Sequence, residues 1–215
     1  MDFSTVSENL DFLLVGIRTT ILLAAAATVG GTAIGLAAAL GRLNGGRIVD
    51  GVLKLYIDLF RSTPLLIQLI WFFFALPVLT GGSLTPFAAA FLALSLYHGA
   101  FFTEIFRAGI ASTARGQGEA GLALGMSRTQ AYRRIVLPQS FVRVLPVISQ
   151  QIVILLKDTS LASVITVTEL TWRAQNIGTQ ALDPVPVLTA ALVVYMLLCL
   201  PITAVGNVAY RRLRS

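Results

Sequence analysis

Five long apolar runs, separated by short polar or glycine- and proline-rich breaks, dominate the chain. A helix that crosses a lipid bilayer needs about 20 mostly apolar residues, and each run reaches that length. The runs cover residues 10–40, 49–79, 86–111, 140–166 and 185–210. The breaks are GRLNGGR, LTGGSLTP, NIGTQALDPVP and the longer stretch 112–138. This pattern predicts an all-α integral membrane protein with five transmembrane helices, forming one domain over residues 1–215.

The composition agrees with a membrane protein, because 56% of the residues are hydrophobic and only 12% are charged. A soluble domain of 215 residues cannot bury that apolar share. The pI near 10.1 does not indicate nucleic-acid binding, since the basic residues lie between apolar runs rather than on one soluble face. The N-terminus MDFSTVSENLDF lacks the basic region of a cleaved signal peptide, so we expect the first run to remain as a membrane helix.

The distribution of basic residues predicts the orientation, because cytoplasmic loops collect Lys and Arg. With the N-terminus outside, only Arg18, Arg61, Lys157 and Arg173 of the 16 Lys and Arg residues are left buried or external. We therefore expect an external N-terminus and a cytoplasmic C-terminus. The stretch 112–138 then lies in the cytoplasm.

The segment EAGLALGMSRTQAYRRIVLP, residues 119–138, predicts a short amphipathic helix. Leu122, Ala123 and Met126 recur at helical spacing. The polar side carries Arg128, Gln130, Arg133 and Arg134. The helix is too short and too charged to cross a membrane, and composition alone favours a helix that lies on anionic lipid headgroups.

Residues of this segment also carry a family resemblance. Its Glu119, Ala120, Gly125, Ile135, Leu137 and Pro138 have the spacing of the EAA loop found in membrane subunits of bacterial ABC importers. Gly121 departs from that pattern, which has a second Ala there, and lowers the helix propensity by about 1 kcal/mol. The stretches YIDLFRSTPLLIQL, TEIFRAGI, RGQGEA and LLKDTSLASVITVTEL are similar to the polar amino acid branch, which carries histidine, glutamine, glutamate, arginine or cystine.

The resemblance implies a type I ABC importer transmembrane subunit whose EAA loop is a coupling helix in a cleft of an ATPase. The residues expected to make the coupling contacts are Glu119, Ala120, Gly121, Ala123, Leu124, Gly125, Met126 and Ser127. The implied partners are two ATPase copies, a second identical or paralogous permease subunit, an extracytoplasmic substrate-binding protein and membrane lipid. The complex would import polar amino acids across the bacterial plasma membrane, with ATP and magnesium bound by the ATPase.

The chain itself carries no motif for nucleotide, metal or catalysis. Both lysines, Lys54 and Lys157, follow leucine, so no Gly-Lys pair opens a phosphate loop. His98 is the one histidine and Cys199 the one cysteine, which excludes an internal disulfide and a multi-ligand metal site. We therefore expect a pore subunit without enzymatic activity or a bound cofactor.

Polar residues at membrane depth are costly and mark a path or a partner. The candidates for a substrate path are Asp58, Arg61, Tyr97, His98, Glu104, Lys157, Asp158, Thr159 and Ser160. The spacing of three residues predicts local ion pairs between Glu104 and Arg107 and between Asp58 and Arg61. The alternative is contact with an amino acid zwitterion, with Glu104 at the ammonium and Lys157 or Arg61 at the carboxylate.

Buried charges leave a second function class open, an ATP-independent secondary transporter or channel with a proton relay. Such a protein needs no cytoplasmic coupling segment. The segment 119–138 therefore favours the ABC importer.

Overall fold

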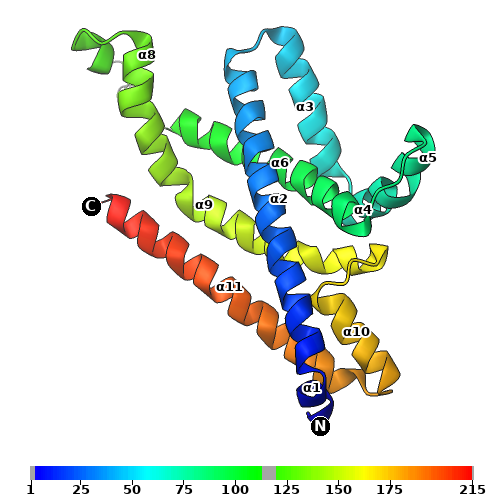
Figure 1. Cartoon of the computed structure of the whole chain (residues 1–215). Coiled ribbons are helices and arrows are strands. Elements are labelled where there is room, and N and C mark those ends of the chain that lie inside the picture. The colour runs from blue at the N-terminus through cyan, green and yellow to red at the C-terminus, as the bar shows by residue number, and fades with distance from the viewer. Residues whose placement is uncertain (1–2, 113–119, 215) are drawn as a thin grey trace.

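The computed structural model describes residues 3–112 and 120–214, which form helices joined by short turns (Figure 1). No β-strand occurs among these described residues, so the expected all-α fold is confirmed. Four helical stretches are long and apolar enough to cross a membrane. They are α2 (Leu10–Asn44), α6 (Pro86–Ser112), the stretch Thr129–Ile165, which contains α9 (Leu137–Asp158) and the 3₁₀ turn η3 (Thr159–Ile165), and α11 (Pro184–Arg214).

The apolar run at 49–79 is bent rather than straight, and this differs from the single span that the pattern predicts. Helix α3 (Arg47–Ser62) ends just before Thr63, and the chain turns by 106°. It continues as α4 (Leu65–Ile70), the π-helix η1 (Trp71–Ala75) and α5 (Leu76–Thr80). Counted as one broken span, this pair gives up to five spans.

Pro64 explains the bend. A proline lacks the N–H that a helix needs and forces the preceding residue into an extended conformation, and Thr63 has φ −114° and ψ 143°. The Gln68 side chain fills the break, because its Nε2 donates to the Phe60 carbonyl at 3.0 Å and to the Thr63 hydroxyl at 2.7 Å. Helix α4 then enters the core through the buried Leu65.

The core forms where α2 crosses α6, and small residues set the distance between the two helices. A Cβ atom added to Gly35 would lie 2.5 Å from the Phe102 Cβ and 3.0 Å from the Gly99 carbonyl oxygen. Glycine therefore lets the two backbones approach closely, as in many membrane helix pairs. Leu23 and Leu94 are fully buried in the same cluster.

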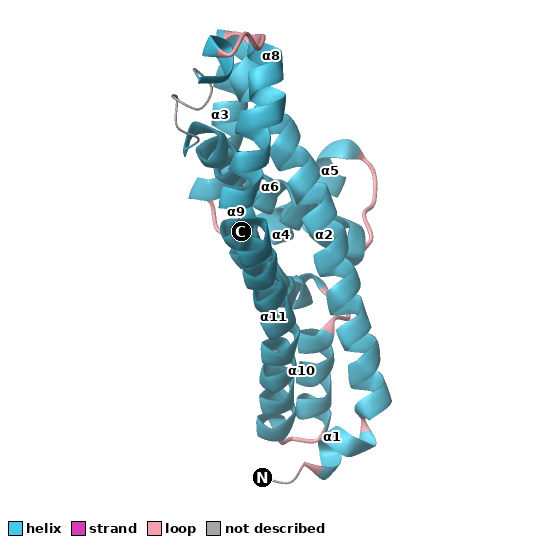
Figure 2. Cartoon of the chain, turned by 90° about the vertical axis from the view of Figure 1, so that its left-hand side faces the viewer, coloured by secondary structure: helices cyan, strands magenta, loops and turns pink. Residues whose placement is uncertain are grey.

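The two ends of the molecule carry different elements (Figures 1 and 2). One end, which we call the α8 end, holds the turn between α2 and α3 and the short helix α8 (Arg128–Ala131), which the π-helix η2 (Tyr132–Val136) joins to α9. The opposite end, the α10 end, holds α1 (Ser4–Glu8) and α10 (Leu170–Gln180).

Candidate functional site

The EAA-like segment begins outside the described residues, since Glu119 is not among them, and its described part starts at Ala120. A helical turn ends at Gly125, which has φ +80°. The Gly125 N–H donates to the Leu122 carbonyl at 3.0 Å and the Met126 N–H to the Gly121 carbonyl at 3.1 Å, the Schellman pattern of a helix end. Glycine is therefore favoured at position 125 by the backbone itself.

A capping box starts the helix that follows. The Ser127 N–H donates to the Gln130 side-chain oxygen at 2.9 Å, and the Gln130 N–H donates to the Ser127 hydroxyl at 3.3 Å. These reciprocal bonds satisfy donors that a helix start leaves open. The segment from 120 to 131 is thus a helical turn, a tight reversal and a capped helix.

The exposed side of this segment is apolar. Leu124 is 79% exposed and Leu122 is 43% exposed, and Ala120 and Ala123 are exposed as well. Gly121 instead faces the chain's own fold, because a Cβ there would lie 2.8 Å from the Ile135 Cδ1. An apolar surface therefore stands open at the α8 end, and Gly121 does not contribute to it.

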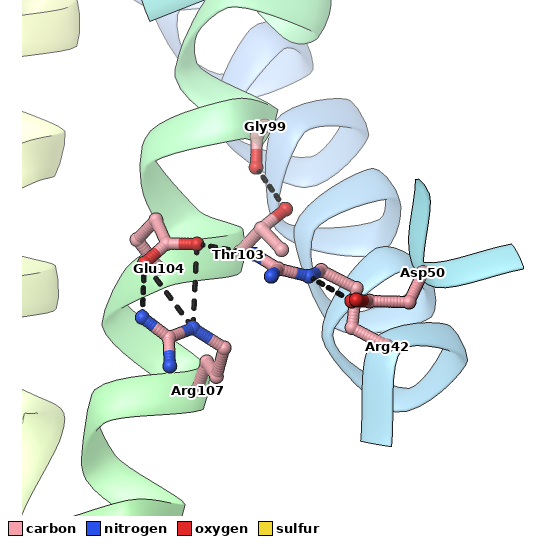
Figure 3. A network of polar contacts seen from close by, with 6 residues as sticks. All are labelled: Arg42, Asp50, Gly99, Thr103, Glu104 and Arg107. Carbon is pink, nitrogen blue, oxygen red and sulfur yellow. Dashed lines mark hydrogen bonds and ion pairs between the residues drawn. The ribbon is translucent and has the colours of Figure 1, made fainter. Parts of the chain in front are cut away.

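A network of charges joins three helices at the same end (Figure 3). The Glu104 carboxylate on α6 accepts from Arg107 Nη2 at 2.7 Å and from Arg42 Nη1 at 2.8 Å. Arg42, at the end of α2, also donates from Nε to Asp50 of α3 at 2.8 Å. The ion pair expected between Glu104 and Arg107 is present, whereas Arg42 and Asp50 were missed because the helix crossing, not local spacing, brings them to Glu104.

The second expected ion pair, between Asp58 and Arg61, is wrong. Within residues 3–112 and 120–214, Asp58 makes no ion pair, and the Arg61 guanidinium lies 5.1 Å from the centre of the Phe101 ring. Both charged residues are exposed, and an exposed ion pair contributes about 0–1 kcal/mol. The contact with an aromatic face offers Arg61 a comparable stabilisation.

A groove of about 450 Å³ runs between α6 and α9 beside this network. The polar and aromatic residues that line it include Arg61, Phe101, Glu104, Arg143 and Gln151. The groove thus brings together two of the predicted path residues, Arg61 and Glu104. It is open enough to hold a small polar molecule.

A buried polar cluster continues from the groove along the same two helices. Gln151 Nε2 lies 2.8 Å from Nδ1 of the fully buried His98, and the His98 Nε2 lies 3.2 Å from an Asp158 carboxylate oxygen. Tyr97 packs edge-on against the His98 ring. Three predicted residues therefore meet here, and Gln151, which the sequence pattern did not single out, joins them to the groove.

Lys157 and Ser160 lie away from this cluster. They line a separate pocket of about 280 Å³ with Thr171 and Tyr195, between η3, α10 and α11. Thr159 is buried and donates to the Leu156 carbonyl at 2.7 Å. The nine predicted path residues therefore do not form one site within this chain.

Glu169 is a further buried acid that sequence reasoning did not single out. It accepts from the Trp172 N–H at 2.7 Å, the Thr171 N–H at 2.9 Å and the Tyr195 hydroxyl at 2.7 Å, and so caps the start of α10. Burial raises the pKa of the Glu169 carboxyl, although these hydrogen bonds oppose the shift. An acidic residue just before a helical pattern was the available signal.

Comparison with known proteins decides the family. Residues 31–215 match the model of the family described as binding-protein-dependent transport system inner membrane component. The chain belongs to this family. This inner membrane component is therefore a multi-pass permease subunit of an ABC transport system, as the EAA-like segment predicted.

Relatives of this inner membrane component align over nearly its whole length. It is 39% identical to the L-cystine transport system permease protein TcyB of Bacillus subtilis, over 92% of this chain and 85% of that protein. It is 34% identical to the glutamine transport system permease protein GlnP of Escherichia coli, over 99% and 98%. A crystal structure of an amino acid ABC transporter with histidines has a chain that superposes with a TM-score of 0.93 at 28% identity, covering 99% of both chains. The type I importer fold is thereby confirmed.

Among the described residues, no group of three metal-ligating side chains lies close enough to hold a metal ion.

Proposed function

We propose that this chain, with a second identical or paralogous subunit, forms the transmembrane path of an ATP-driven importer of polar amino acids. Relatives at 39% and 34% identity carry the names of cystine and glutamine permeases, which supports an amino acid substrate. Inward transport would be driven by two partner ATPase subunits that bind ATP and magnesium. An external substrate-binding protein would deliver the amino acid.

The observation that carries this proposal is the exposed apolar turn at 120–125. Burying a leucine side chain stabilises a complex by about 1.5–3 kcal/mol, and Leu124 is 79% exposed. The small Ala120 and Ala123 beside it would let the backbone approach a partner closely. We assign this surface, together with Glu119, to the cleft of the ATPase.

The orientation that fits these roles has the α8 end in the cytoplasm and the α10 end outside. Ser127 and Gln180 are exposed at the two ends, so each can be replaced by cysteine in a Cys199→Ser background. In intact cells, Ser127→Cys should resist a membrane-impermeant thiol reagent and Gln180→Cys should react. The reverse pattern would overturn the orientation.

The groove and the buried cluster between α6 and α9 are our candidate for the substrate path. Arg61 is exposed over the Phe101 ring and can meet the carboxylate of an amino acid. Glu104 already accepts from two guanidinium groups, so Asp158 beside Tyr97 and His98 is better suited to the ammonium group. Arg61 in the groove and Asp158 in the buried cluster would then recognise the two charges that all amino acids share.

The function is tested in proteoliposomes that contain the complete complex with its ATPase and binding protein. The wild-type complex should transport a labelled polar amino acid only when ATP is present on the side of the membrane that carries the ATPase subunits. Ala123→Trp should abolish the ATP hydrolysis that the binding protein stimulates, whereas Val29→Trp, in the middle of α2 on an exposed face, should not. Unchanged stimulation in Ala123→Trp would refute the coupling role, and uptake driven by a proton gradient without ATP would favour a secondary transporter.

A further inference from the structure

Helix α3 is weakly held by apolar packing. Of its residues, Ile57 is buried, while Ile48, Val52 and Leu55 are exposed. Polar contacts must therefore contribute much of what fixes its position. One of them is the Tyr56 hydroxyl, which donates to the Leu96 carbonyl of α6 at 2.6 Å.

The contact at the other end of α3 is the bridge through Arg42. The guanidinium donates to Asp50 from Nε and to Glu104 from Nη1, both at 2.8 Å, and the Arg42 side chain is only 16% exposed. The planar fork of arginine suits two carboxylates on different helices, whereas the point charge of lysine does not. Arg42 thus ties α2, α3 and α6 together at the α8 end (Figure 3).

The charges of this network balance within the chain. Arg42 and Arg107 supply two cations, and Asp50 and Glu104 supply two carboxylates. Because no net charge is left over, the network needs no ligand to complete it. These four residues link α2, α3 and α6 by salt bridges, and we call this network the joint.

The place of the joint suggests what it does. Glu104 and Arg107 lie within the last three turns of α6, which ends at Ser112, and the EAA-like segment follows α6 in the chain. The part of α6 from Glu104 to Ser112 is about 12 Å long, so a displacement of the end of α6 also displaces the joint. Arg42 would pass it to the hairpin of α2 and α3.

We propose that Arg42 is a positioning residue for transport, which makes the α2–α3 hairpin and the α8 end of α6 move as one unit when the ATPases displace the coupling segment. This inference rests on the proposed function of the coupling segment. Arg42 touches neither substrate nor nucleotide. It acts by holding Asp50 and Glu104 together.

The test uses the complete complex in proteoliposomes and measures ATP hydrolysis and amino acid uptake on the same sample. Arg42→Gln should lower the amount transported per ATP hydrolysed by about tenfold, a size typical of coupling between sites, while hydrolysis itself continues. Arg42→Lys should recover part of this loss, since it keeps one of the two bridges. Lys54→Gln on the exposed side of α3 is the matched control and should behave as wild type.

A double-mutant cycle identifies the joint itself. Asp50→Asn should lower transport per ATP, and combining it with Arg42→Gln should cause no further loss, because Arg42→Gln has already removed the bridge to Asp50. A merely structural role would lower uptake and hydrolysis in parallel, and that result would overturn the inference. An unchanged ratio in Arg42→Gln would also overturn it, whereas absent uptake in wild type would instead refute the proposed function.

Discussion

Replacing Glu104 by glutamine tests whether this acid holds the fold or contacts the substrate. The Glu104 side chain is 23% exposed, and its carboxylate accepts from Arg42 at 2.8 Å and Arg107 at 2.7 Å. Glutamine keeps the shape and one acceptor oxygen but removes the charge. One of the two guanidinium groups therefore loses its acceptor at position 104.

The size of the effect follows from these contacts. A hydrogen bond to a charged group contributes about 1.5–3 kcal/mol, and the partial exposure favours the lower part of that range. We expect Glu104→Gln to lower the free energy of unfolding by about 2 kcal/mol. For a chain of 150–250 residues this lowers Tm by roughly 4–8 °C.

Thermal unfolding of the purified complex, followed by tryptophan fluorescence, measures the stability. Basal ATP hydrolysis and the amino acid concentration for half-maximal stimulation measure the function. We expect higher basal hydrolysis and an unchanged half-maximal concentration, because both carboxylate oxygens are already used by arginines. Asp58→Asn, an exposed acid without an ion pair in the described part of the chain, is the control. An unchanged Tm with a raised half-maximal concentration would refute the scaffold role and assign Glu104 to the substrate.

Further predictions concern the helix crossing and the buried acid. Gly35→Ala should lower the free energy of unfolding by about 1–3 kcal/mol, because its Cβ would collide with Phe102. The control Gly51→Ala, with no atom within 4 Å of its Cβ, should raise it by about 0.4–1 kcal/mol. Equal Tm values for the two variants would refute the close crossing of α2 and α6. Because burial raises the pKa of Glu169, the folded state binds the proton more tightly than the unfolded state. The stabilisation is complete below the ordinary glutamate pKa and is lost as pH rises through the folded value. Glu169→Gln should remove this dependence, and an unchanged pH profile of unfolding would contradict it.

The sequence predicts the long spans well because their signal is local. Helix α6 begins at Pro86 and ends at Ser112, within one residue of the run 86–111, since length and hydropathy suffice for a spanning helix. The apolar pattern does not predict the 106° bend before α4, although Thr63 and Pro64 are visible in the sequence. The apolar pattern continues on both sides of the proline, and hydropathy carries no information on the direction in which the second helix leaves the first.

The candidate site was predictable only where contacts are local. The pair of Glu104 and Arg107 follows from helical spacing, but Arg42 reaches Glu104 from 62 positions away. That contact depends on the angle and depth at which α2 crosses α6, and these depend on Gly35 and its neighbours. Ionic partners that meet through a helix crossing cannot be derived from spacing along one helix.

The departure of Gly121 from the EAA pattern has a packing reason that propensity alone could not supply. Glycine costs about 1 kcal/mol in a helix relative to alanine, yet an alanine Cβ would lie 2.8 Å from Ile135 and 3.2 Å from the Ala131 Cβ. The Ile135 side chain and the Ala131 methyl group would have to give way to the added methyl group. Glycine at position 121 therefore lets the helical turn pack directly against Ala131 and Ile135. In this arrangement Leu122 and Leu124 are exposed, where a partner can reach them.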